Sequence, residues 1–312
     1  MSEGLKSLRI EGLIGNGCFG YVFLARSSEF RSLAWKRMLK AGDKVSREFE
    51  VLERLKGAKH VVKLIHFFYS INCVNEVIQN FVFDFYSSNL EEVLKLHQNK
   101  MISMSYSTIK RVMFQVLQGI SELHSKQVCH RDLKPENVLI KDSTCVIADL
   151  GSAKVLQEKN SPYVVSRYYR APELILGIDS YNHSIDLWSF GVIFFEFLAK
   201  KLPFKGRTEG QQLIEIFRAL GAPSEEDSSW LKDRMRRVPL EAEVIFSIRD
   251  NKKVLKCLDH LKISETELKM LKELFQSIWR YKFSQRPKTS EVIDLPFWDD
   301  VRNSAESFKI AI

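Results

Sequence analysis

The most constraining feature of the sequence is a polar run in the first half of the chain, His130 to Asn137, which reads HRDLKPEN. Two further motifs follow it, Asp149-Leu150-Gly151 and Ala171-Pro172-Glu173. An ordered set of eight residues at a fixed distance from other motifs is not expected by chance. The region therefore predicts a chemical site and not a run of residues kept for packing.

A glycine-rich turn lies near the start of the chain, between two segments that are predicted to be strands. It reads GNGCFGYV from Gly15 to Val22. Glycine has no Cβ, so the backbone of such a turn can close over phosphate groups without interference from side chains. Taken alone the turn is a weak signal, because a glycine turn between strands is often only a hairpin.

A lysine and a glutamate follow the glycine turn. Lys36 lies on a predicted strand, and Glu48 lies on the helix that the apolar spacing predicts over 44–56. A lone lysine or glutamate is more often a solvated surface charge. Their shared position after the glycine turn favours a functional pair.

The periodicity of the apolar residues changes along the chain. Before about residue 85, short strand-like runs surround a single helical segment. Long helical periods follow at 105–126, 183–199, 209–220 and 265–280. The pattern predicts an α+β fold with two lobes, a small β-rich lobe with one main helix over residues 1–85 and a large α-helical lobe over 86–312.

These motifs, in this order, resemble the eukaryotic protein kinase superfamily, and the resemblance extends from Ile10 to Trp298. It implies transfer of the γ-phosphate of ATP, which needs phosphates held, metal ions bound and a hydroxyl positioned. A lysine at position 134 is similar to the kinases that phosphorylate serine and threonine. The resemblance therefore implies a serine/threonine kinase that uses ATP and Mg²⁺ and acts on protein substrates. Two substrate classes stay open, substrates that are already phosphorylated and proline-directed substrates.

The resemblance also implies a role for each catalytic residue. Asp132 would accept the proton of the substrate hydroxyl, and Lys134 would neutralise charge on the phosphoryl group. Lys36 would contact the α- and β-phosphates, held in place by Glu48.

The resemblance also implies that Asn137 and Asp149 would bind Mg²⁺. Leu150 stands where the superfamily usually has phenylalanine, and its apolar side chain should still fill that position. By the same resemblance, ATP would contact Ile14, Gly15, Asn16, Gly17, Cys18, Phe19, Gly20, Val22, Ala34, Lys36, Asp84, Tyr86 and Leu139.

Three further residues have structural roles in the superfamily. Asp186 would accept hydrogen bonds from the backbone of the HRDLKPEN loop. Glu173 and Arg286 would form a buried ion pair.

Within the superfamily, SRYYRAPE at 166–173 resembles the group that unites cyclin-dependent, MAP and glycogen synthase kinases. The segments IGNGCFG, HFFYS and DLGSAK are most similar to glycogen synthase kinases. Residues 81–94 are more similar to the hinge of cyclin-dependent kinases. One alternative therefore stays open, a cyclin-dependent-like kinase that needs a partner subunit to seat Glu48 against Lys36.

Three cations are expected to form a phosphate pocket beside the catalytic residues: Arg47, Arg131 and Lys154. Each is close in sequence to a carboxylate of the site, and a phosphate could accept charge-assisted hydrogen bonds from all three. Its source stays open between a substrate that is already phosphorylated and phospho-Ser161 of the chain itself. The resemblance to glycogen synthase kinases also predicts phosphorylation of Tyr163.

The composition narrows the remaining function classes. A net charge of +8 favours anionic partners, but no RNA or DNA motif accompanies it, so nucleic-acid binding is not expected. Five scattered cysteines argue against a disulfide framework and against a zinc site. Without a signal-like start or a membrane-length apolar run, the expectation is a cytoplasmic or nuclear protein with no membrane partner. An inactive scaffold is disfavoured because every charged catalytic residue is present, and a regulatory or scaffold subunit is left open as a partner.

Overall fold

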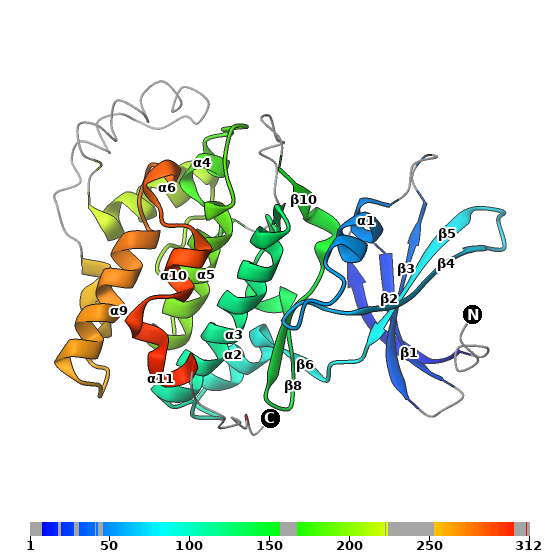
Figure 1. Cartoon of the computed structure of the whole chain (residues 1–312), viewed down its shortest axis with the longest axis horizontal. Helices are drawn as coiled ribbons and strands as arrows, with labels where there is room; N and C mark the ends of the chain where they lie inside the picture. Colours follow the sequence, from blue (N-terminus) through cyan, green and yellow to red (C-terminus); the bar gives the residue numbers. More distant parts are fainter. Residues whose placement is uncertain are drawn as a thin grey trace.

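The computed structural model describes residues 8–17, 20–27, 31–40, 42, 46–156, 167–221, 223, 253–302 and 310. Within these ranges, a sheet-rich region comes first along the chain and a helical region follows. The two regions lie side by side, with the blue and cyan strands on the right of Figure 1 and most helices on the left. This arrangement confirms the predicted α+β fold with two lobes.

The first region is an antiparallel sheet in the spatial order β1-β2-β3-β5-β4. Its strands are β1 (Arg9–Gly17), β2 (Gly20–Arg26), β3 (Ser32–Leu39), β4 (Leu64–Ile71) and β5 (Val77–Asp84). Helix α1 (Arg47–Arg54) packs against the sheet, and the rings of Phe49 and Phe67 stack with their centroids 4.3 Å apart. Helix α1 lies inside the segment 44–56, as its apolar spacing predicts.

Strand β5 lies inside this sheet and is buried along most of its length. Asn80 is fully buried there. Its amide oxygen accepts from Trp35 Nε1 at 3.0 Å, and its amide nitrogen donates to Ser70 Oγ at 2.9 Å. A buried amide is tolerated when its hydrogen bonds are satisfied in this way. These bonds tie β3, β4 and β5 together.

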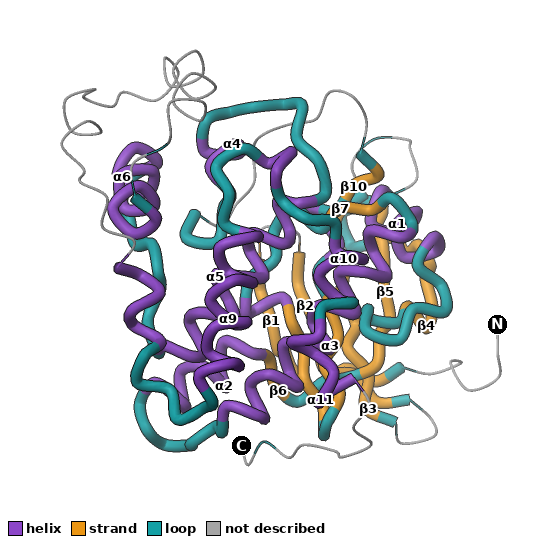
Figure 2. The backbone as a smooth tube through the Cα atoms, turned by 60° about the vertical axis from the view of Figure 1, so that its left-hand side comes forward, coloured by secondary structure: helices purple, strands orange, loops and turns teal. Residues whose placement is uncertain are grey.

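The second region is built around one helix, α5. Its helices are α2 (Leu90–Gln98), α3 (Tyr106–Ser125), α4 (Pro172–Ile175), α5 (Ser184–Ala199), α6 (Glu209–Leu220), α9 (Glu265–Ile278), α10 (Thr289–Ile293) and α11 (Asp299–Arg302). Every residue of α5 from Ser184 to Leu198 is buried, as expected for a helix that is apolar on all sides. Helices α3 and α9 pack against it (Figure 2). The predicted helices over 105–126, 183–199, 209–220 and 265–280 correspond closely to α3, α5, α6 and α9.

Short strands and turns fix the loops where the two regions meet. β6 (Ser88–Asn89), β8 (Val138–Lys141) and β9 (Thr144–Ile147) form one small sheet, and β7 (Val128–Cys129) pairs with β10 (Lys154–Val155). The 3₁₀ turns are η2 (Pro135–Asn137), η3 (Leu150–Ser152), η4 (Lys253–Leu258), η5 (Phe283–Gln285) and η6 (Pro296–Trp298). Because β8 pairs with β9 and β7 pairs with β10, the loop after β7 and the loop after β9 are held next to each other.

A buried ion pair joins α4 to the segment between η5 and α10, as predicted. Arg286 Nη1 and Nη2 donate to the two carboxylate oxygens of Glu173 at 2.6 and 2.7 Å, and both side chains are fully buried. The guanidinium also lies 4.9 Å from the ring centroid of Trp188 on α5. The bidentate geometry satisfies both charges inside the core. Of the helices that the structure describes, none has the length and apolar character needed to cross a bilayer.

Candidate active site

A cavity of about 630 Å³ lies between the sheet and the helical region. This volume is in the range of pockets that bind small molecules and cofactors. Of the residues predicted to contact ATP, those that line it are Ile14, Gly15, Asn16, Gly20, Val22, Ala34, Lys36, Asp84, Tyr86 and Leu139. Gly17 is described but is not part of the lining, and Cys18 and Phe19 lie outside the described residues.

The register of the sheet explains why residues from different strands meet at this cavity. Val22 on β2 is opposite Lys36 on β3, and Ala34 on β3 is opposite Phe83 on β5. Because side chains alternate along a strand, Ala34 and Lys36 point to the same face. Gly20, at the start of β2, has a φ of +125°, and a Cβ added there would clash with the backbone of β3. Only glycine is accommodated at that position without strain.

The predicted pair of Lys36 and Glu48 is formed. Lys36 Nζ lies 2.8 and 2.9 Å from the two carboxylate oxygens of Glu48, and 3.2 Å from Asp149 Oδ1. Burial opposes the charged ammonium, but the carboxylates of Glu48 and Asp149 outweigh it and raise the pKa of Lys36. The lysine is therefore held as a cation in the cavity wall.

One buried carboxylate organises the loop that follows β7. Asp186, near the start of α5, accepts from the backbone N–H groups of His130 at 2.8 Å and Arg131 at 2.9 Å. His124 Nε2 lies 2.9 Å from the same carboxylate. Arg131 has a φ of +70°, in the left-handed region that residues other than glycine rarely adopt. The hydrogen bonds to Asp186 hold this strained turn in place, as predicted for this aspartate.

Asp132 follows the strained turn and is held by its neighbours on the same loop. Lys134 Nζ lies 3.2 Å from Asp132 Oδ2, and Asn137 Nδ2 donates to Asp132 O at 2.8 Å. Asp132 is only 6% exposed. The loop thus presents a carboxylate with a cation beside it, which suits a group that accepts a proton next to developing negative charge.

Two oxygen donors for a metal ion lie on neighbouring loops. Asn137 and Asp149 both line the cavity, and Ala148 N donates to Asn137 O at 2.8 Å, which ties the loops together. Burial opposes ionisation of Asp149, but Lys36 and His130 outweigh it and lower the pKa of Asp149. An ionised carboxylate and an amide oxygen fit Mg²⁺, which is commonly held by one or two carboxylates together with phosphates and water. Leu150 is buried beside this site and fills the position expected of it.

The three cations of the predicted phosphate pocket come together. Lys154 on β10 is opposite Cys129 on β7 and therefore close to Arg131, whose Nε donates to Ser152 O at 2.7 Å. Burial lowers the pKa of Lys154, and the positive charges of Arg131 and Arg47 lower it further. This mutual repulsion indicates a cluster suited to an anion. Ser161 and Tyr163, the predicted phosphorylation sites, lie outside the described residues.

Several residues at the site were not predicted from the sequence. The cavity is also lined by Val62, Glu92, Glu136 and Ala148. Tyr169 OH donates to Glu196 Oε2 on α5 at 2.8 Å, and burial raises the pKa of Glu196 to about 7 in spite of this bond. Glu136, Glu92 and Tyr169 lie within segments that were singled out, HRDLKPEN, 81–94 and SRYYRAPE, but no role was predicted for them. Val62, Ala148 and Glu196 had no such signal.

Comparisons with known proteins agree with this geometry. Residues 8–298 match the family model described as protein kinase domain. The chain is 33% identical over 299 residues to the probable serine/threonine-protein kinase glkA of Dictyostelium discoideum, which covers 95% of this chain and 59% of that protein. It is also 33% identical over 267 residues to the serine/threonine-protein kinase RIM11/MSD1 of Saccharomyces cerevisiae, covering 82% of this chain and 72% of the relative. The chain thus spans less than two thirds of the first relative's length.

Proposed function

Because this chain belongs to the protein kinase domain family, we propose that it is an active serine/threonine kinase that transfers the γ-phosphate of ATP to proteins. The observation that carries the proposal is the contact of Lys36 with Glu48 at 2.8 Å, in the same cavity as Asp149. In kinases this pair must be in place for phosphoryl transfer. Here it is made within one chain, which supports activity without the partner subunit of a cyclin-dependent-like kinase.

Each residue of the site has a chemical task in this proposal. Lys36 contacts the α- and β-phosphates, and Asp132 orients the substrate hydroxyl and accepts its proton. Lys134, close to Asp132 Oδ2, neutralises charge on the transferred group. Asn137 and Asp149 hold Mg²⁺, which neutralises charge on the phosphates when it is bound.

The proposal also assigns the residues that contact adenine and the function of each lobe. Backbone groups of Asp84 and Tyr86 are the proposed hydrogen-bond partners of adenine, with Ala34, Val22 and Leu139 packing on its faces. We assign the ATP-binding lobe to residues 1–85. The lobe that carries the catalytic loop and binds the substrate is assigned to residues 86–312.

The substrate is proposed to be a protein that already carries a phosphate. Support comes from the cluster of Arg47, Arg131 and Lys154, since the charges of the first two lower the pKa of the third. A phosphate on the substrate would relieve the repulsion among them. Phospho-Ser161 of the chain itself is the competing occupant, and phospho-Tyr163 is a second proposed modification.

Substitution of the two carboxylates tests the proposed function. Asp132→Asn should leave ATP binding intact and reduce turnover at least ~10²-fold, because it removes the proton acceptor. Asp149→Asn should in addition weaken the binding of Mg²⁺-ATP, because it removes a metal ligand. The measurements are steady-state phosphorylation of a serine peptide and titration of ATP binding with and without Mg²⁺. Wild-type turnover in Asp132→Asn would contradict the proposed function.

A further inference from the structure

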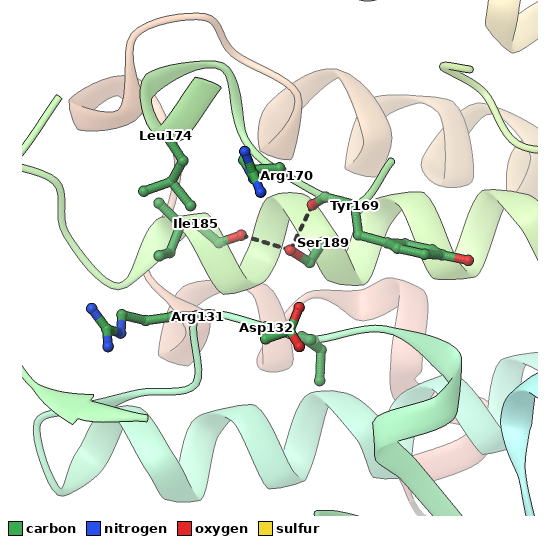
Figure 3. Close-up of a pocket in the computed structure, with 8 residues that line it drawn as sticks. Arg131, Asp132, Tyr169, Arg170, Leu174, Ile185 and Ser189 are labelled. Carbon is green, nitrogen blue, oxygen red and sulfur yellow. Dashed lines mark hydrogen bonds between the residues drawn. The ribbon is translucent and has the colours of Figure 1, made fainter. Parts of the chain in front are cut away.

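A second, much smaller cavity adjoins Asp132. Its volume is about 10 Å³, which is close to the roughly 10–15 Å³ that a single buried water molecule requires. The loop that carries Asp132, the segment that leads into α4, and helix α5 all contribute residues to its lining (Figure 3). Its size therefore suits one water molecule, at the point where three separate segments meet.

Two buried polar atoms of this lining have no hydrogen-bond partner among the described residues, Asp132 Oδ1 and Arg170 Nε. Asp132 is 6% exposed and Arg170 is 8% exposed, so bulk water does not satisfy them. Leaving a buried donor or acceptor unsatisfied destabilises the folded state. One atom is an acceptor and the other is a donor, which is the pairing that one water molecule can bridge.

One other polar atom of each side chain is already held. Asp132 Oδ2 lies 3.2 Å from Lys134 Nζ. Arg170 Nη1 donates to Glu209 Oε1 on α6 at 2.8 Å. Within the described part of the chain no direct ion pair joins Arg170 to Asp132. Burial lowers the pKa of Arg170, while the charges of Glu209 and Asp132 oppose that shift.

A third polar group completes the surroundings of the water. The two dashed lines of Figure 3 join Ser189 Oγ on α5 to Tyr169 O at 2.8 Å and to Ile185 O at 3.2 Å, and the hydroxyl donates to these carbonyl oxygens. Its single hydrogen is directed at these carbonyl oxygens, and the lone pairs of the hydroxyl oxygen can still accept a hydrogen bond. A buried water molecule usually makes about three hydrogen bonds. The lining supplies one donor and two acceptors for it.

We propose that a bound water molecule in this cavity accepts from Arg170 Nε and donates to Asp132 Oδ1 and Ser189 Oγ, and that Arg170 is a positioning residue for Asp132. This inference rests on the proposed function, in which Asp132 accepts the proton of the substrate hydroxyl. Lys134 holds one carboxylate oxygen and the water holds the other, so the carboxylate cannot rotate. A fixed carboxylate keeps its lone pair aligned with the hydroxyl, and the reaction rate depends steeply on such alignment.

Substitution of Arg170 by lysine tests whether Arg170 acts through Nε and the bound water or only through its positive charge. Arg170→Lys keeps a cation that can reach Glu209, but lysine has no nitrogen at the position of Nε. We expect kcat to fall about 10-fold, with the KM values for ATP and peptide changed less than about two-fold, because only the geometry of the reacting group is affected. The melting temperature should stay close to that of the wild-type protein.

Two further variants control for the alternatives. Glu209→Gln removes the charge that anchors Arg170 and leaves Nε and the cavity in place, so its kcat should stay within about two-fold of wild type. In the background of Asp132→Asn, Arg170→Lys should have almost no further effect, because residues that act as a unit are not additive. A loss of the same size in both backgrounds would contradict the inference.

A crystal structure of the full chain at atomic resolution tests the water directly. We expect one ordered water molecule within hydrogen-bond distance of both Asp132 Oδ1 and Arg170 Nε, and its loss in Arg170→Lys. An active wild-type protein without this water, or Arg170→Lys with unchanged kcat or with only a raised peptide KM, would overturn the inference. An inactive wild-type protein that nevertheless holds the water would contradict the proposed function instead.

Discussion

At the scale of single residues, Asp186 holds the catalytic loop in place although it does not line the cavity. Burial alone would raise the pKa of this carboxyl, but hydrogen bonds from His124 and from the backbone of His130 outweigh it and lower the pKa to about 2. The same carboxylate accepts from Arg131 N, at a residue in the left-handed region. The position of Asp132 therefore depends on the ionised form of Asp186.

The folded-state pKa of Asp186, about 2, is below its ordinary value of 3.8, so its ionisation stabilises the folded state. This ionisation contributes about 2 kcal/mol to the free energy of unfolding. The contribution is fully present above about pH 4 and is lost as the pH falls towards about 2. Asp186→Asn should lower the free energy of unfolding at neutral pH by about 3 kcal/mol, because its amide nitrogen would face a backbone donor. The difference from wild type should shrink as the pH falls through this window. Urea unfolding at a series of pH values measures it, and a constant difference at every pH would contradict the assignment.

At the scale of elements, the phosphate pocket depends on three segments that are far apart in the sequence. Arg47 begins α1, Arg131 lies after β7, and Lys154 begins β10. The pairing of β7 with β10 fixes two of the cations relative to each other. Helix α1 supplies the third, and the contact of Glu48 with Lys36 fixes this helix against the sheet. A shift of α1 would therefore change both the catalytic pair and the pocket.

A pair of peptides that differ only in a phosphoserine on the C-terminal side of the acceptor tests this pocket. We expect the wild-type protein to prefer the phosphorylated peptide, and Arg47→Ala to lose about 10-fold in kcat/KM for that peptide alone, because one charge-assisted hydrogen bond is removed. Arg54→Ala is the matched control, since Arg54 lies at the other end of the same helix, where it donates to Lys126 O at 3.3 Å. Absence of a preference in the wild-type protein, together with loss of activity in Ser161→Ala, would favour phospho-Ser161 as the occupant.

At the scale of the whole molecule, the helical region is held together by α5 and by the pair of Glu173 and Arg286. This pair joins α4 to the segment between η5 and α10, which is far along the chain from it. Both side chains are fully buried, so water cannot compensate either charge if its partner is removed. The pair therefore links the segment that leads into α4, and Arg170 within it, to the core.

Glu173→Gln should lower the free energy of unfolding by about 3–5 kcal/mol, because it leaves the guanidinium of Arg286 buried without its counter-charge. The surface pair of Arg218 and Glu215 on α6 provides the control, because both side chains are more than a third exposed. Glu215→Gln should cost less than about 1 kcal/mol. Urea denaturation of the three proteins measures both effects. Equal losses of unfolding free energy in the two variants would show that the buried pair stabilises the protein no more than the surface pair.

Local patterns determined much of this protein. The apolar periods of α3, α5, α6 and α9 predicted those helices, since a helix that packs on a core must repeat its apolar residues. The motifs predicted most of the cavity lining and the contact of Lys36 with Glu48, because each motif position has a fixed chemical task. The pair of Glu173 and Arg286 was expected from the resemblance. Leu150 fills its position as an apolar residue should.

Tertiary structure alone decided which side chains share a small buried space. Arg170 meets Asp132 at one cavity, Tyr169 bonds to Glu196, and Glu136 joins the cavity wall. Such contacts join residues that are distant in sequence and follow no periodic pattern, so they cannot be predicted from the local sequence. Their energies depend on distance and burial, because the same pair of groups interacts far more weakly in water than inside a protein. Only the packing of the catalytic loop against α5 and the segment before α4 sets those distances.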